Sequence, residues 1–278
     1  MALISFILQA TLLSPVFLSA VTIILVLERL LPVDPKQPTF SVGFLQDSVW
    51  LVLALAFTGS AVAVYSEGLK KLFETHLNFL TVKNMEHLPE AARMGLSVLL
   101  SDFLAWFQHW LKHKVPWFWQ FHAVHHSQRQ MNLFTDLRFH YMEYLISRPI
   151  VLLPLLIFQI DTVHIIGFGL VSTWQTRFYH ASIRINLGFL RFIFVTPQSH
   201  RVHHSIEDKH RDRNFGVMFS FWDRLFGTQH PDAQVYPRTG IEDPSFPLEQ
   251  RGGLPRALVT AVKQMVYPFR VIGGLHGR

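Results

Sequence analysis

Long uncharged stretches alternate with short polar ones along the chain. Two of these stretches, Ala2–Leu27 and Ser48–Tyr65, contain no charged side chain. A helix needs about 20 mainly apolar residues to cross the hydrocarbon core of a bilayer, so we predict two membrane spans here. The first has no basic segment before it and no small-residue cleavage pattern after it, which favours a retained span over a secretory signal.

Further apolar segments predict more helices. Met94–His113 reads as a third hydrophobic helix that Pro116 ends. Residues 144–160 and 163–180 predict a helical hairpin that re-enters the membrane and returns at His180. We therefore expect an all-α membrane bundle of about four spanning helices with a cytosolic, histidine-rich helical cap.

The same pattern suggests three regions. Residues 1–93 hold the first spans and an interfacial loop. Residues 94–228 hold the histidine motifs and the hairpin. Residues 229–278 are rich in proline and glycine, and we expect them to form a peripheral tail.

Composition supports a membrane location and limits the chemistry. Only 16% of the 278 residues are charged, against about 25% in a typical soluble domain. The chain has no cysteine, which excludes disulfides, thiolate-ligated zinc and iron–sulfur clusters. A net charge of +6 suits anionic lipid headgroups; nucleic-acid binding is the weaker reading, because acids and histidines interrupt the basic residues. Basic residues around the histidine motifs favour a cytoplasmic side for them.

Histidines gather in three short motifs: "HWLKH", "HAVHH" and "HRVHH". Helical residues three or four positions apart share a face, so each motif presents a stripe of imidazole, a good ligand for iron, zinc, copper and nickel. In a chain of this composition, H-x-x-H-H arises by chance only about 0.05 times. Eight histidines exceed the needs of one ion, so we expect two ions with four or five ligands each, which suits iron with an open position for O₂ better than zinc.

The motifs, followed by "SHRVHHS", "DRNFG" and "FWDRLFGT", resemble the fatty acid hydroxylase/sterol desaturase superfamily over about Asp102–Thr228. The resemblance implies a membrane enzyme with a di-iron centre of two Fe ions. Such an enzyme uses O₂ to hydroxylate or desaturate a lipid: a sterol, a fatty acyl chain or an alkylglycerol-type lipid. The family's ligand motifs fall on His109, His113, His122, His125, His126, His200, His203 and His204.

Two more histidines match family positions. His180, in "RFYHASI", is a ligand candidate at the end of the hairpin, with a satisfied interfacial histidine as the alternative. His140, in "RFHYMEY", stands where relatives often have R-x-H-P-x-E, but Tyr141 replaces the proline, and its role stays open.

Carboxylates are expected to orient the ligands, because a metal-bound imidazole usually donates its second N–H to a carboxylate or carbonyl. Asp102 lies two helical turns before His109 and is the first candidate. Asp212 is the second, while Asp136 and Glu143 are weaker ones; each acid could instead be solvated or paired with arginine.

The chemistry needs electrons from outside the chain. No flavin-type G-x-G-x-x-G and no haem-domain H-P-G-G is present, so we expect a separate donor, a ferredoxin or cytochrome b5 with its reductase. The basic residues Arg201, Lys209, Arg211 and Arg213 suggest where an acidic donor docks. Two other functions remain open: a zinc membrane hydrolase, although H-E-x-x-H is absent, and a metal transporter or sensor, although the motifs lie at helix ends.

Overall fold

The computed structural model describes residues 15–57, 63–83, 85–160 and 162–274. Helices dominate this part of the chain, and its β-structure consists of isolated bridges only. The helices are α2 (Pro15–Leu30), α3 (Phe44–Phe57), α4 (Ala63–Leu72), α5 (Glu90–Lys114), α6 (Pro116–His126), α7 (Tyr141–Ile157), α8 (Thr162–His180), α9 (Pro197–His203), α10 (Phe221–Leu225) and α11 (Gly253–Ile272). Short 3-10 or π turns lie between them, among them η5 (Thr135–Leu137) and η6 (Gly188–Phe192). The all-α expectation is confirmed.

The membrane spans are not confirmed. Among the described residues, no helix combines the length and the hydropathy that crossing a bilayer requires. The expected spans Ala2–Leu27 and Ser48–Tyr65 fall partly on residues 1–14 and 58–62, which lie outside the described residues.

The other expected helices are present. Helix α5 contains the predicted stretch Met94–His113 and ends at Lys114; Pro116 then begins α6. Proline is well suited to a first helical position, because its missing N–H would have no partner there. The hairpin is formed by α7 and α8, with Pro149 and Pro154 inside α7. The break between α5 and α6 therefore separates the first histidine motif from the second.

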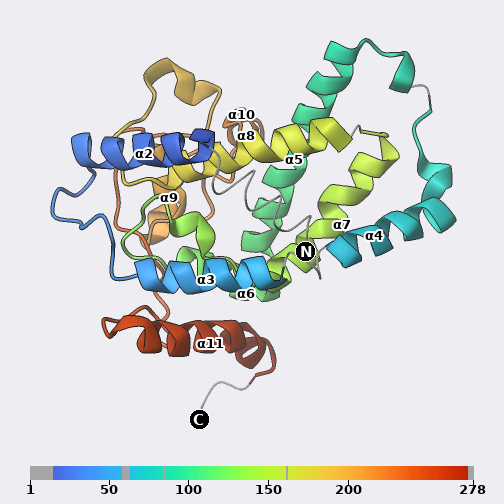
Figure 1. Ribbon diagram of the computed structural model, residues 1–278. Helices are drawn as coiled ribbons and strands as arrows, with labels where there is room; N and C mark the ends of the chain where they lie inside the picture. The colour runs from blue at the N-terminus through green and yellow to red at the C-terminus, as the bar shows by residue number, and fades with distance from the viewer. Residues whose placement is uncertain (1–14, 58–62, 84, 161, 275–278) are drawn as a thin grey trace.

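Helices α5 to α9 surround one central region (Figure 1). Helix α5 packs against α6, α7 and α8, and α8 packs against α9. Helix α9 is short, but a reciprocal cap stabilises its start: Thr196 accepts from the Ser199 backbone N–H, and Ser199 accepts from that of Thr196. The cap fixes the helix that carries His200 and His203.

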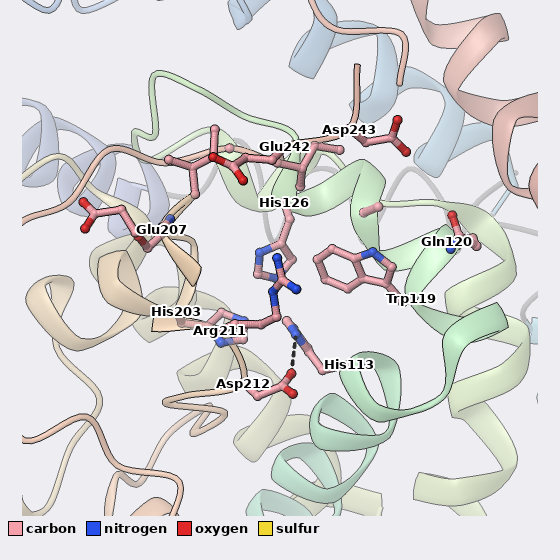
Figure 2. A pocket seen from close by; sticks show the side chains of 15 residues that line it. His113, Trp119, Gln120, His126, His203, Glu207, Arg211, Asp212, Glu242 and Asp243 are labelled. Carbon is pink, nitrogen blue, oxygen red and sulfur yellow. Dashed lines mark hydrogen bonds and ion pairs between the residues drawn. The ribbon is translucent and has the colours of Figure 1, made fainter. Parts of the chain in front are cut away.

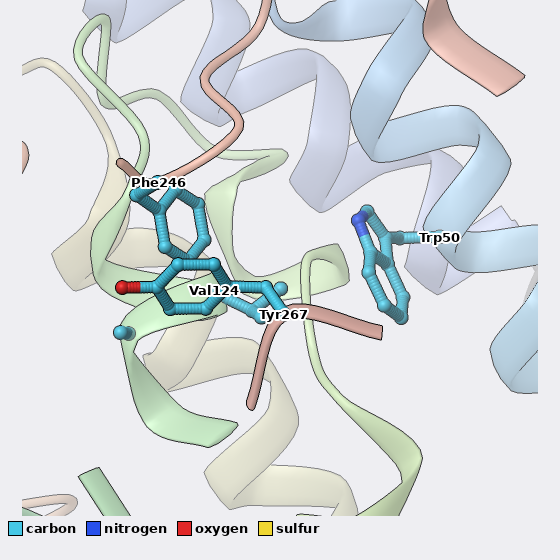
Figure 3. Close-up of a cluster of buried hydrophobic side chains, with 5 residues drawn as sticks. Trp50, Val124, Phe246 and Tyr267 are labelled. Carbon is cyan, nitrogen blue, oxygen red and sulfur yellow. The ribbon is translucent and has the colours of Figure 1, made fainter. Parts of the chain in front are cut away.

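Figure 1 shows α11 lying below α3 and α6, and it packs against both. Figure 3 shows Trp50 of α3 and Val124 of α6 in one buried cluster with Phe246 and Tyr267. No helix is predicted for residues 229–278 from their proline and glycine content. The composition misleads because only Gly253, Pro255 and Pro268 lie within residues 253–272, and the first two stand at the start of the helix. This last part is an apolar helix that joins the core.

A fully buried arginine ties the N-terminal and C-terminal regions to the centre. Arg138 Nε donates to Asp47 Oδ1 of α3 at 2.8 Å, and its Nη1 donates to Glu249 Oε2 at 3.0 Å. Both carboxylates are needed, because a buried guanidinium without ionic partners would be costly. The backbone of Arg138 belongs to the site itself.

Candidate metal centre

All nine histidines expected as ligands converge at the meeting point of four helices. Helix α5 supplies two, α6 three, α8 one and α9 two, and His204 follows α9 directly. Their ring nitrogens form two groups, and within each group the nitrogens lie no more than 4.8 Å from one another. The first group is His109, His113, His122, His126 and His203; the second is His125, His180, His200 and His204.

The two H-x-x-H-H motifs divide between the groups in a regular way. In α6, His122 and His126 join the first group and His125 joins the second. In the other motif, His200 and His204 join the second group and His203 joins the first. In each motif, the first and last histidines, four positions apart, thus belong to one group. The middle histidine, three positions after the first, belongs to the other group. Each motif therefore bridges both groups rather than presenting a single stripe.

Backbone carbonyls fix the orientation of several rings. His109 Nδ1 donates to the carbonyl of Phe215 at 2.9 Å, His203 Nδ1 to that of Arg213 at 2.9 Å, and His125 Nδ1 to that of Arg138 at 3.1 Å. A carbonyl only accepts, so Nδ1 carries the proton in each ring and Nε2 keeps its lone pair for a ligand bond.

His122 has a carboxylate partner instead. Its Nδ1 lies 2.8 Å from Glu143 Oε2, and the same oxygen lies 3.0 Å from Lys112 Nζ. Both side chains are buried: Glu143 is 0% and Lys112 3% exposed. Glu143, one of the two weaker carboxylate candidates from the sequence, thus contacts an expected ligand directly.

Asp102, the first candidate, has different partners. Its carboxylate accepts from the backbone N–H groups of Met218 (2.8 Å) and Phe219 (3.1 Å), and from Trp222 Nε1 (2.9 Å). The expected bond to a ligand histidine is absent from the described structure, because the Phe215 carbonyl occupies the position beside His109. Asp102 therefore acts on the loop after residue 214, and only through that loop on His109.

The remaining acidic candidates are also located. Asp212 lies beside His113, with 3.9 Å between Oδ1 and Nδ1, and forms an ion pair of 2.5 Å with Lys114. Its backbone has a positive φ of 59°, a conformation that aspartate tolerates better than most residues. Asp136 pairs with Arg177 at 3.7 Å rather than with a histidine.

Sequence reasoning missed Asp223. Its carboxylate accepts from the backbone N–H groups of Phe215 and Gly216, both at 2.8 Å, and from Trp106 Nε1 at 3.0 Å. Burial raises the pKa of Asp223 above its ordinary value, while these hydrogen bonds act in the opposite direction. Asp102 and Asp223 thus hold the same loop, which presents the Phe215 carbonyl to His109. The motif "FWDRLFGT" contains this aspartate, but its partners are distant in sequence.

The same loop leaves no room for a side chain at Gly216. A Cβ there would lie 2.8 Å from Val195 Cγ2 and 2.9 Å from the Phe219 carbonyl oxygen. We expect Gly216→Ala to cost about 1–3 kcal/mol of stability and to weaken metal binding by displacing the Phe215 carbonyl. Gly95→Ala is the matched control, because nothing lies within 4 Å of its Cβ position. Thermal unfolding and bound-metal content that match in the two variants would contradict this account of the loop.

His140 is not part of either group. Its Nε2 lies 3.0 Å from the carbonyl of Met265, and its Nδ1 accepts from the backbone N–H of Met142 at 3.2 Å. Both ring nitrogens are thus engaged, one with α11 and one as the cap of α7. The structure resolves the open question in favour of a structural histidine.

The donor set fits metal ions. In the first group, Nε2 of His113, His122, His126 and His203 is buried without a hydrogen-bond partner in the described structure, a costly arrangement unless something else binds these atoms. Burial lowers the pKa of His203 to about 4 and those of His122 and His126 well below the usual value. The rings are therefore neutral at neutral pH, which is the form that binds metal.

A cavity of about 370 Å³ opens onto the first group. Figure 2 shows His113, His126 and His203 around it, together with the indole of Trp119 and the side chain of Arg211. The four histidines of the second group are not among the described residues that line it. A small molecule entering this cavity would therefore reach the five-histidine group first.

Comparisons with known proteins agree on one family. Residues 94–228 match the family model described as fatty acid hydroxylase. The chain is 26% identical over 218 residues to an ornithine lipid hydroxylase of Rhizobium tropici, covering 77% of this chain and 66% of that protein.

Two other relatives act on other lipids. The chain is 33% identical over 127 residues to the alkylglycerol monooxygenase of Homo sapiens, covering 46% of this chain and 28% of that protein. It is 25% identical over 147 residues to the cholesterol 25-hydroxylase of Rattus norvegicus, covering 50% and 49%. The chain thus spans less than two thirds of each of these relatives. No solved structure matches it.

Proposed function

This chain belongs to the fatty acid hydroxylase superfamily, and we propose that it hydroxylates a C–H bond of a lipid at a pair of iron ions. The reaction takes one O₂, two protons and two electrons, places one oxygen atom in the product and releases the other as water. The observation that carries the proposal is the pairing of two buried histidine groups, each with its nitrogens within 4.8 Å.

Nine side chains would hold the iron. His109, His113, His122, His126 and His203 would bind one ion, and His125, His180, His200 and His204 the other. Nitrogen donors alone do not select iron over zinc or copper, so iron follows from the family. The bound iron pair would supply O₂ activation.

The chain's own residues prepare the site. The carbonyls of Phe215, Arg213 and Arg138 hold three rings with Nε2 free, and Glu143 holds His122. Asp102 and Asp223 fix the loop behind His109. The cavity lets the reacting carbon approach the five-histidine group, while burial of the rings excludes bulk water around them.

A lipid substrate implies a membrane location, and we propose an integral membrane enzyme whose histidine groups face the cytoplasm. Large exposed apolar side chains support contact with lipid: Ile23 and Val26 on α2, and Leu170 and Val171 on α8, are between 49% and 58% exposed. Residues 94–228 would form its catalytic region.

A separate electron donor, a ferredoxin or cytochrome b5 with its reductase, completes the proposal. The expected basic docking surface presents fewer unpaired cations than its sequence suggests. Arg201 is buried and donates to the Pro237 carbonyl, while Lys209 and Arg211 pair with the neighbouring acids Glu207 and Asp208. Of the four expected cations, Arg201 is therefore unavailable and two others are paired with neighbouring acids, so we propose no site for the donor.

Untargeted lipid analysis tests the function. Cells that express the chain should contain lipids heavier by one oxygen atom, and these species should be absent with the His203→Ala variant. Loss of two hydrogens would indicate desaturation instead. Lipid cleavage products that also form without O₂ would indicate a hydrolase and contradict the proposal.

A further inference from the structure

Helix α11 has one face packed on the protein and one exposed face. The buried face, which includes Ala261, Gln264 and Tyr267, lies against α3 and α6. Large apolar residues, each between 38% and 59% exposed, cover the other side: Leu254, Leu258, Val259, Val262, Val266, Phe269 and Ile272. Most of them follow one another at intervals of three or four residues, which places them on a continuous stripe.

Three cations run along one edge of that stripe. Arg256, Lys263 and Arg270 are exposed and follow one another at intervals of seven residues. Seven residues are close to two helical turns, so the three side chains project to nearly the same side. No aspartate or glutamate occurs between Gly253 and Ile272. The helix is therefore amphipathic, and all of its charged side chains are basic.

These features identify the partner by its chemistry. An apolar stripe flanked by cations matches the boundary between acyl chains and anionic headgroups. A second copy of the chain fits less well, because a symmetric contact places the same surface on both sides. In the antiparallel form of such a contact, the two rows of like charge would come together. We propose that α11 docks in the surface of an anionic bilayer, with the stripe in the acyl region and the three cations at the headgroups.

Docking of α11 would also position the metal centre. The helix packs directly on α6, which carries His122, His125 and His126. The carbonyl of Met265 additionally bonds His140, the cap of α7. A helix held at the membrane surface would thus fix how the histidine groups face the lipid. The inference rests on the proposed membrane location, but its test does not depend on turnover.

The absence of cysteine from the chain allows a clean experiment. The Val262→Cys variant of the full-length protein is labelled with an environment-sensitive fluorophore, and the purified protein is placed in lipid nanodiscs that contain phosphatidylglycerol. We expect a blue-shifted emission that spin-labelled acyl chains quench. Gln234→Cys, on an exposed loop, is the control and should keep the emission of a label in water without quenching.

Three further measurements make the result decisive. Adding Arg256→Glu, Lys263→Glu and Arg270→Glu to the labelled Val262→Cys protein should reduce quenching of the label at least about twofold; unchanged quenching would overturn the role of the cations. A blue shift that lipid does not quench, and that is lost when the protein itself is diluted, would assign the stripe to a second copy. Adding His203→Ala instead should leave the label's signal unchanged, so failure of docking and failure of the proposed chemistry are separable.

Discussion

Replacing His203 with alanine is expected to lower lipid hydroxylation at least about 100-fold and to remove about one metal ion per chain. Its Nε2 is buried without a partner in the described structure, among the nitrogens of the five-histidine group. Loss of a residue that only orients a ligand typically costs 10–100-fold in metal affinity or activity, and loss of the ligand itself should exceed that. Metal analysis of the purified protein and product formation in cells measure the two effects.

The matched control is His76→Ala, which removes an exposed histidine outside both groups. It should retain its metal and its activity. A His203→Ala protein that is folded and as active as His76→Ala would rule out the five-histidine group as the reaction site.

Replacing Glu143 with glutamine should lower the free energy of unfolding more than Gly216→Ala does. The carboxylate forms a fully buried pair with Lys112, and removing one member of such a pair typically costs about 3–5 kcal/mol, since the remaining charge has no partner. The same change removes the charged acceptor of His122, so metal affinity should also fall 10–100-fold. Thermal unfolding and metal titration measure both.

A double variant separates these two effects. Lys112→Met combined with Glu143→Gln leaves no unpaired charge, so most of the stability should return, whereas the weakened hold on His122 should remain. Glu207→Gln, in the exposed pair with Lys209, is the control and should change stability little. Equal stability of Glu143→Gln and Glu207→Gln would show that the buried pair has no structural role.

The sequence predicted those parts of the structure that depend on local pattern. Apolar periodicity predicted α5 and the α7–α8 hairpin, and proline predicted the break at Pro116. The motif spacing predicted which eight histidines gather, and the family resemblance added His180. The limit on ligands per ion predicted four or five in each group. These are properties of short segments, and helical geometry transmits them directly to the fold.

Features set by long-range packing were not predictable in this way. Asp102 and His109 share a helix face, but the Phe215 carbonyl lies beside the histidine and accepts its hydrogen bond. The carboxylate of Asp102 instead accepts from backbone N–H groups of the same loop. The role of Asp223 was not predictable for the same reason, because Trp106, one of its partners, is distant in the sequence. The role of His140 depends on Met265 of α11, a helix that the composition of its region concealed.

Isotope labelling with heavy O₂ tests the central claim most directly. Cells expressing the chain are supplied with O₂ of the heavy oxygen isotope, and the lipids that depend on the intact protein are analysed by mass spectrometry. Our account predicts that each such lipid gains one heavy oxygen atom, and that His203→Ala cells lack these species. Protein-dependent products that carry oxygen from water instead would contradict an O₂-dependent hydroxylase.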